Sequence, residues 1–256
     1  MAEHSLKGKV VVVGGGAKNL GGLISRTFAA EGAKLVVHYN SAATAAAAAE
    51  TVAAIQAAGG EVISVQGDLT KAANVTSLFA EAKRHYGGID IAINTVGKVL
   101  KKPIIETSEE EYDSMSDINA KAAYFFIKEA GKTLNDNGRI CTLVSSLLAA
   151  YTGFYSTYAG TKAPVEHFTR AASKEFGARG ISVTAIGPGP MDTPFFYGQE
   201  GAEAVAYHKS AAALSAFSKT GLTDIEDIVP LVKFLVTEGW WITGQTIFAN
   251  GGYTTR

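Results

Sequence analysis

Short apolar runs alternate with longer amphipathic or alanine-rich stretches along this chain. The runs are rich in β-branched residues, and several are apolar at nearly every position. That pattern is typical of parallel strands that are covered on both faces. The expected strands span residues 9–13, 34–39, 61–66, 90–94, 139–145, 181–186 and 246–250.

Helical stretches lie between these strands, and the alanine-rich one at 42–58 predicts a solvent-facing crossover helix. Strict alternation of strands and helices predicts βαβ units. We therefore expect an α/β fold, a doubly wound (Rossmann) parallel sheet of about seven strands with helices on both faces. The expected helices span residues 22–30, 42–58, 72–86, 109–135, 155–178 and 225–237.

Residues 1–256 contain no proline- or serine-rich linker, which predicts a single domain. One long segment between strands, about 194–223, lacks a clean pattern. Segments of that length within a compact domain are usually functional. We expect this one to be a loop that contacts the substrate.

Composition and charge narrow the possible partners. The net charge is −1, from 23 basic and 24 acidic residues without a dense basic run, which argues against nucleic acid or an anionic membrane. The histidines lack metal-ligand spacing, and the single cysteine, Cys141, fits a small buried core residue. No stretch resembles a signal peptide or a membrane span, so we expect a cytoplasmic protein without a metal.

A glycine-rich loop, GGGAKNLGG at 14–22, connects the first strand to the first helix. Such a turn lets the backbone approach a pyrophosphate, which the helix N-terminus stabilises. The match to the G-x-G-x-x-G fingerprint is loose, but the position after the first strand favours a dinucleotide site. The expected contacts are Gly15, Lys18, Asn19, Leu20 and Gly21.

The end of the second strand indicates which dinucleotide binds. An acidic residue there usually accepts the ribose hydroxyls, but this chain has His38, Tyr39, Asn40 and Ser41. Lys18 adds positive charge where a 2′-phosphate would lie, so the sequence favours NADP(H) over NAD(H). Asp68, followed by Leu69, ends the third strand and either contacts the adenine or caps the helix beginning near residue 72.

Tyr158 and Lys162 are four residues apart in an expected helix and therefore share one face. A free phenol has a pKa of about 10, and a nearby ammonium group lowers it toward a range useful for acid–base catalysis. Ser145 precedes Tyr158 by thirteen residues (158 − 145) and ends an expected strand. Ligands bind at that edge of such a sheet, so these side chains predict a catalytic site.

Together these residues resemble the classical short-chain dehydrogenase/reductase family, over essentially the whole chain. In this resemblance Asn119, Ser145, Tyr158 and Lys162 match the catalytic tetrad, and Ser145 fits its serine better than Ser146 does. The remaining matches are Asn94 and Gly97 of the Asn-Asn-Ala-Gly motif and Pro188, Gly189, Met191 and Thr193 of the nicotinamide-binding turn.

The chain departs from the family pattern at four positions. Gly14 replaces a loop threonine whose hydroxyl ties the loop to neighbouring backbone, and Asn19 replaces a glycine. Asparagine tolerates the left-handed conformation, so we expect the turn to form. Thr95 and Val96 replace the second Asn and the Ala of the Asn-Asn-Ala-Gly motif.

The resemblance implies hydride transfer between NADP(H) and a small-molecule ketone, aldehyde or secondary alcohol. Tyr158 would donate the proton, Ser145 would orient the carbonyl oxygen, and Lys162 would lower the tyrosine pKa and hold the nicotinamide ribose. Asn119 would anchor a water that links Lys162 to solvent, unless it bonds only to backbone. Thr193, with the backbone near Met191, would hold the carboxamide.

The aromatic and small residues of the 194–223 segment suggest an apolar or aromatic ketone, with His208 as a candidate contact. A 3-oxoacyl-thioester reductase and a non-catalytic dinucleotide-sensing protein are the alternatives. Retention of the whole tetrad argues against the second of these. The family also implies a homotetramer, in which Trp240 and Trp241 lie either in the core or at an interface.

Overall fold

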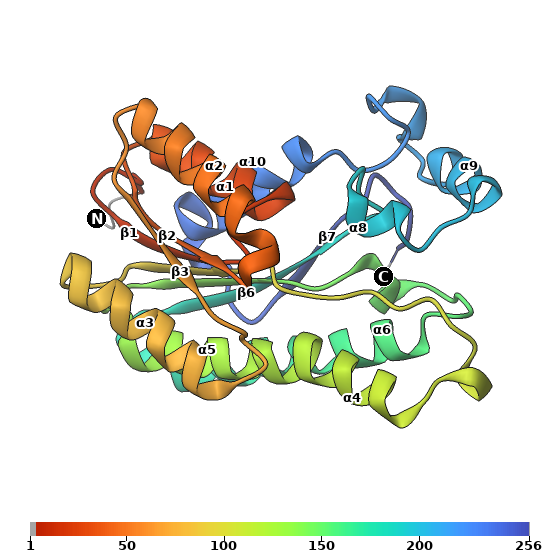
Figure 1. Cartoon of the computed structure of the whole chain (residues 1–256), viewed down its shortest axis with the longest axis horizontal. Helices are drawn as coiled ribbons and strands as arrows, with labels where there is room; N and C mark the ends of the chain where they lie inside the picture. The colour runs from red at the N-terminus through yellow and green to blue at the C-terminus, as the bar shows by residue number, and fades with distance from the viewer. Residues whose placement is uncertain (1–3, 256) are drawn as a thin grey trace.

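The computed structural model describes residues 4–255, in which a seven-stranded parallel sheet lies between two layers of helices (Figure 1). The strand order is β3-β2-β1-β4-β5-β6-β7, which confirms the predicted doubly wound fold. The strands are β1 (Val10–Gly14), β2 (Lys34–Tyr39), β3 (Val62–Gln66), β4 (Ile91–Asn94), β5 (Arg139–Leu143), β6 (Ser182–Pro188) and β7 (Thr246–Ala249).

In Figure 1, α1, α2 and α10 cover one face of the sheet, and α3, α4, α5 and α6 lie on the other. Two further short helices, α8 and α9, lie beyond the sheet at one end. The helices are α1 (Asn19–Ala30), α2 (Ala45–Ala57), α3 (Ala72–Tyr86), α4 (Glu109–Ser116), α5 (Ala122–Thr133), α6 (Ser156–Lys162), α7 (Pro164–Glu175), α8 (Pro194–Tyr197), α9 (Ala202–Ala211) and α10 (Ile225–Val236).

The central strands are apolar at successive positions because both of their faces are buried. In β1, Val11 and Val13 pack with residues of α1 and α10, whereas Val10 and Val12 pack with residues of α3 and α5. Side chains alternate between faces along a strand, so an uninterrupted valine run supplies both cores. Cys141 is fully buried in the first of these cores, as predicted.

The order of the strands creates a crevice between β1 and β4. The chain moves from β1 outward to β2 and β3 and then returns to β4 on the other side of β1. Gly14 and Asn94 are register partners at the ends of these two strands. The loops that follow diverge to opposite faces of the sheet, which is where open α/β sheets bind ligands.

Three expected helices are interrupted. The 42–58 helix begins only at Ala45, after a turn of 3₁₀ helix at Ala42–Thr44. The 109–135 helix is divided into α4 and α5 by a π-helical turn, Asp117–Lys121. The 155–178 helix is divided at Pro164, which has no amide hydrogen for the bond to the preceding turn.

Two other expectations change near the carboxyl edge. β5 ends at Leu143, so Ser145 lies in the following loop rather than in the strand. The 194–223 segment contains α8, α9 and a 3₁₀ turn at Ser215–Phe217 instead of being irregular. No residue of α9 is fully buried, so this helix lacks the apolar stripe that would have predicted it.

Candidate active site

A cleft of about 490 Å³ opens at the carboxyl edge of the sheet. Cofactor and small-molecule sites commonly enclose ~300–1,000 Å³, so its size suits such a ligand. The cleft brings together most of the predicted site residues. Those that line it are Gly15, Lys18, Asn19, Leu20, Gly21, Tyr39, Asn40, Leu69, Gly97, Ser145, Tyr158, Lys162, Pro188, Gly189, Met191 and Thr193.

The glycine loop adopts the tight turn that was predicted. Gly15 has a φ of 74° and Asn19 a φ of 49°, so asparagine does take up the left-handed conformation. A Cβ on Gly21 would lie 2.2 Å from the Gly15 carbonyl oxygen, so only glycine allows the close approach of helix and loop. The first residues of α1 line the cleft, so contact of their amides with a pyrophosphate stays the expectation.

Thr95 supplies the hydroxyl that Gly14 lacks. Its Oγ1 donates a hydrogen bond to the Gly14 carbonyl at 2.8 Å and lies 3.3 Å from the Gly15 carbonyl. A Cβ on Gly14 would lie 3.0 Å from the Phe126 ring and 3.1 Å from Asn94 Oδ1. The departures from the family pattern at Gly14 and Thr95 thus compensate each other. The hydroxyl that holds the glycine loop comes from Thr95, after β4, instead of from position 14.

His38 holds the loop from beneath, a role that the sequence did not indicate. Its Nδ1 accepts a hydrogen bond from the Gly15 amide at 3.0 Å, and its Nε2 lies 2.7 Å from the Gly67 carbonyl. The residue is 2 % exposed, and burial lowers the pKa of the imidazole. A neutral imidazole satisfies both contacts at once, because one nitrogen accepts while the other donates.

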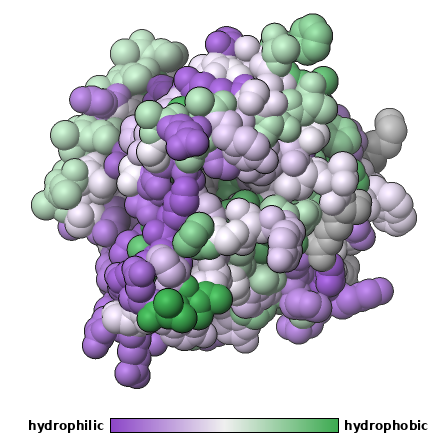
Figure 2. Space-filling view, turned by 90° about the vertical axis from the view of Figure 1, so that its right-hand side faces the viewer, coloured by the Kyte–Doolittle hydropathy of each residue, from purple (hydrophilic) through white to green (hydrophobic). Residues whose placement is uncertain are grey.

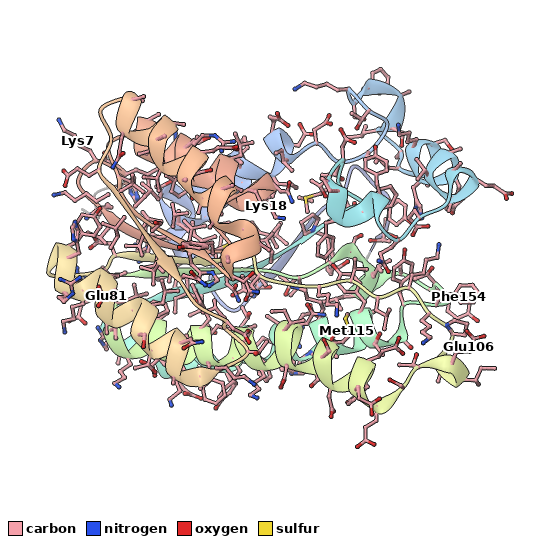
Figure 3. The ribbon with its side chains drawn as sticks, in the orientation of Figure 1. Lys7, Lys18, Glu81, Glu106, Met115 and Phe154 are labelled. Atoms are coloured by element: carbon pink, nitrogen blue, oxygen red, sulfur yellow. The ribbon has the colours of Figure 1, made fainter. Side chains whose placement is uncertain are left out.

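Positive charge without an opposing carboxylate marks the expected adenosine end. Figure 3 shows Lys18 near the middle of the molecule, just before α1, whereas Lys7 lies at one edge. Tyr39, Asn40 and Thr44 line the same part of the cleft. Thr44 was missed by the sequence reasoning, because the turn that carries it was expected to belong to a regular helix.

Two of the predicted adenosine contacts lie outside the lining of the cleft. Ser41 instead forms a capping box with Thr44 at the 3₁₀ turn. Asp68 Oδ1 accepts hydrogen bonds from the amide and hydroxyl of Thr70 at 3.0 and 2.8 Å, and α3 begins without a side-chain cap. The capping role for Asp68 was therefore wrong.

Tyr158 projects from α6 and is 8 % exposed. The hydroxyl of Ser145 hydrogen-bonds the phenol and lowers its pKa, but burial raises it more, to about 12. Ser145 Oγ also accepts from the Leu147 amide at 3.2 Å, which fixes its orientation. This contact favours Ser145 over Ser146 as the catalytic serine, an assignment that stays a prediction.

Lys162 lies one turn beyond Tyr158 and is fully enclosed. Its Nζ donates to the Leu143 carbonyl at 2.8 Å and to the Val96 carbonyl at 3.3 Å. Burial lowers the pKa of the ammonium group to about 8. The expectation that Lys162 lowers the tyrosine pKa is not met in the protein alone, because desolvation of the phenol outweighs other influences.

Asn119 lies in the π-helical turn between α4 and α5 and is completely buried. Its Oδ1 accepts from the Lys98 amide at 3.0 Å, and its Nδ2 donates to the Lys98 carbonyl at 2.9 Å and to Thr161 Oγ1 at 3.1 Å. The side chain therefore joins the loop after β4 to α6. Such π-helical turns occur often at functional sites.

The remaining predicted contacts shape the loops after β4 and β6. Asn94 is buried beneath the cleft lining, and its Oδ1 accepts from the Val96 amide at 3.0 Å. A Cβ on Gly97 would lie 2.9 Å from Lys162 Nζ, so a larger residue there would displace the lysine. Thr193 is buried at the start of α8, and its amide donates to the Met191 carbonyl at 2.8 Å.

Among residues 4–255, no group of histidine, cysteine, aspartate and glutamate side chains is arranged to hold a metal ion. Over the same range, no helix is both long and apolar enough to cross a membrane.

Comparison with known proteins places the chain in a family. Residues 15–254 match the model of a family described as enoyl-(acyl carrier protein) reductase. A hydroxynaphthalene reductase-like protein, Arp2 of Metarhizium brunneum, is 37 % identical, and the alignment covers 98 % of this chain and 97 % of the relative. The chain belongs to the short-chain dehydrogenase/reductase family and is an oxidoreductase.

Two solved structures show the same fold. A crystal structure from Burkholderia cenocepacia, described as a dehydrogenase with bound NADP, is 68 % identical, with a TM-score of 0.98 over 100 % of this chain and 97 % of that one. A blue fluorescent protein from a metagenomic library, in complex with NADPH, is 29 % identical, with a TM-score of 0.89 over 98 % of this chain and 100 % of that one.

Proposed function

We propose that this protein is a carbonyl reductase, transferring a hydride between NADP(H) and a ketone, an aldehyde or the corresponding secondary alcohol. The observation that carries the proposal is the buried Tyr158 phenol, which lines the cleft together with Ser145 and Lys162. The relative named for hydroxynaphthalene reduction supports an aromatic carbonyl substrate.

Each catalytic side chain then has a defined task. The Tyr158 phenol, whose pKa burial raises to about 12, is protonated at neutral pH as an ordinary phenol is, and it can donate to the developing alkoxide. The Ser145 hydroxyl donates a hydrogen bond to the same oxygen. Lys162, whose ammonium is already desolvated, would hold the nicotinamide ribose. Bound NADPH would supply the hydride.

The cofactor contacts remain those inferred from the sequence, with Thr44 added and with Ser41, Asp68 and Asn94 outside the cleft lining. Lys18 and the absence of a carboxylate at the end of β2 support NADP(H) over NAD(H). The complexes of two structural neighbours with NADP and NADPH support the same preference. Calorimetric titration with NADPH and with NADH measures it directly.

Tyr158→Phe tests the mechanism. The variant keeps the ring but loses the proton donor, so kcat for ketone reduction should fall by about 10²-fold or more. The dissociation constant for NADPH should stay within about threefold, because the phenol is not needed to hold the dinucleotide. NADPH absorbance with a panel of aromatic ketones measures the first quantity and fluorescence titration the second.

Tyr112→Phe is the matched control, because Tyr112 is 55 % exposed on α4 and lies outside the cleft. It should retain full turnover. Turnover near the parent rate in Tyr158→Phe would exclude the proposed proton donor.

A further inference from the structure

A cluster of polar side chains lines the substrate end of the cleft, next to the catalytic tyrosine. Glu200, His208, Tyr155 and Tyr253 all line the same cavity as Tyr158. Tyr155 links the cluster to the catalytic residues, because its ring centroid lies 6.3 Å from that of Tyr158. The sequence suggests an apolar or aromatic ketone here, with His208 as a candidate contact.

Glu200 is the central member of the cluster, and its side chain is 0 % exposed. One carboxylate oxygen pairs with Lys101 Nζ, and the other accepts a hydrogen bond from the Tyr155 hydroxyl. A carboxylate offers about four acceptor positions, so further positions stay available. Burial of a charge is costly unless its partners compensate for it, which makes this residue conspicuous in a cavity wall.

His208 lies on the other side of this carboxylate. Its Nδ1 is 2.8 Å from the Tyr253 hydroxyl, and its Nε2 is 3.7 Å from Glu200 Oε1. The second distance is too long for a hydrogen bond, and residues 4–255 provide no other partner for Nε2. With the Tyr253 hydroxyl donating to Nδ1, Nε2 carries the proton and presents a donor beside the Glu200 acceptor.

An acceptor and a donor side by side complement a hydroxyl group, which both donates and accepts. We propose that Glu200 and His208 form a subsite for a hydroxyl group of the substrate. The substrate is then a carbonyl compound that also carries a phenolic or alcoholic hydroxyl group. Its carbonyl group would lie at Tyr158. Its hydroxyl group would lie at Glu200 and His208, beyond the rings of Tyr155 and Phe196 as seen from Tyr158. This inference rests on the proposed carbonyl reduction and adds its specificity.

The aromatic surroundings suit a ring between the two groups. The ring centroid of Phe195 lies 6.2 Å from that of Tyr158, and the ring centroid of Phe196 lies 5.4 Å from that of His208. Figure 2 faces this end of the molecule and shows hydrophobic and hydrophilic surface interspersed on it. The walls can therefore pack a planar apolar body while Glu200 and His208 fix its polar end.

Glu200 also helps to connect the loop after β4 to the segment after α8. The experiment must distinguish this structural role from recognition of the substrate. Lys101 follows β4, and its amide donates to Gln199 Oε1 at 3.0 Å, next to the Lys101–Glu200 ion pair. Gln199→Ala removes one of these ties but leaves Glu200 and His208 in place. Glu200→Gln keeps the volume of the side chain and can still accept from Lys101, but it replaces the second acceptor with an amide donor.

The test compares 1-tetralone with 5-, 6- and 7-hydroxy-1-tetralone in steady-state reduction by NADPH. In the parent enzyme at least one hydroxylated isomer should have a kcat/KM about tenfold or more above that of 1-tetralone, as expected for a hydrogen bond to a charged acceptor. Glu200→Gln should reduce this ratio to within about threefold of unity, mainly through KM. Gln199→Ala should keep the parent ratio.

Three results would overturn the subsite. These are reduction of all four ketones without preference, an unchanged ratio in Glu200→Gln, or an equal loss of the ratio in Gln199→Ala. Each leaves the carbonyl reductase itself intact, because 1-tetralone is still reduced. Failure to reduce any ketone, with NADPH bound and the fold shown by circular dichroism, would instead overturn the proposed function and the subsite with it.

Discussion

His38 connects three parts of the cofactor site through one imidazole. It lies one residue before the end of β2, accepts from the Gly15 amide of the glycine loop and contacts the Gly67 carbonyl beyond β3. Only the neutral ring can accept from Gly15, because protonation places a hydrogen on both nitrogens. Protonation of His38 therefore opposes the folded arrangement of the loop.

The direction of the pKa shift fixes the pH dependence of stability. Burial in the folded state lowers the pKa of His38 below its ordinary value of 6.5. The unfolded chain therefore binds this proton at a higher pH than the folded protein does. The stabilisation is fully present above pH 6.5 and is lost as the pH falls from there through the folded pKa. The melting temperature of the parent protein should thus decrease between pH 7.5 and 5.5, as followed by circular dichroism.

His38→Gln, with a neutral acceptor in place of the imidazole, should flatten this decrease. His85→Gln, at an exposed position of α3, should show the parent slope. A slope in His38→Gln as steep as that of the parent would assign the effect to other groups.

Residue roles were predictable where spacing is local. Tyr158 and Lys162 share one helix face, so their sequence separation alone placed them together. Lys101 and Glu200 are 99 positions apart, and only the tertiary fold pairs them. The sequence predicted a lowered pKa for Tyr158, whereas burial raises it. A sequence does not show how far the phenol is removed from water.

At the scale of elements, α5 and the end of α7 pack with almost no space between them. A Cβ on Gly131 of α5 would lie 2.1 Å from the Phe176 ring, whereas a Cβ on Gly160 of α6 would meet nothing within 4 Å. Two glycines within helices therefore have different reasons to be glycine. The first allows close packing, and the second only lowers helix stability.

Alanine substitutions should have opposite effects at these two positions. Gly131→Ala forces the Phe176 ring to move and should lower the free energy of unfolding by about 1–3 kcal/mol. Gly160→Ala should raise it by about 0.5–1 kcal/mol, because alanine loses less backbone entropy. Urea denaturation measures both, and effects of the same sign would contradict this account of the packing.

The strands were predicted to within a few residues because a parallel sheet buried on both faces leaves a continuous apolar run. The π-helical turn at Asp117–Lys121 was not predicted. Its hydrogen bonds join residues five positions apart, and a single turn of this kind is too short to be recognised from the spacing of hydrophobic residues. The same limitation applies to α9, which has no buried stripe. Amphipathic pattern therefore finds elements that face a core and misses those that face a cleft.

At the scale of the whole molecule, large apolar side chains remain exposed near the end of α10. Phe234 is 44 % exposed and Trp241, in the turn that follows, is 81 % exposed. Trp240 is partly buried beneath the Arg139 guanidinium, 5.8 Å from the ring centroid. The exposure of Trp241 excludes the core role, so we propose the interface for it.

Light scattering coupled to size-exclusion chromatography tests the homotetramer that we propose from the family. The parent mass should be four times the 26.7 kDa of one chain. Trp241→Arg, which places a charge in the proposed contact, should lower it. Ile105→Arg, at a position that is 94 % exposed in another region, should leave the mass unchanged. A tetramer in Trp241→Arg would exclude this surface as the interface.

The pairing of Gly14 with Thr95 has a consequence for attempts to stabilise the protein by restoring common family residues one at a time. Threonine at position 14 would bring its Cβ to within about 3 Å of Phe126 and Asn94, and the hydroxyl it offers is already provided by Thr95. Asparagine at position 95 alone would replace this hydroxyl with a bulkier carboxamide beside Gly15 and Gly21. The two sites are coupled through this hydrogen bond, so a design scheme that scores positions independently would choose wrongly at both.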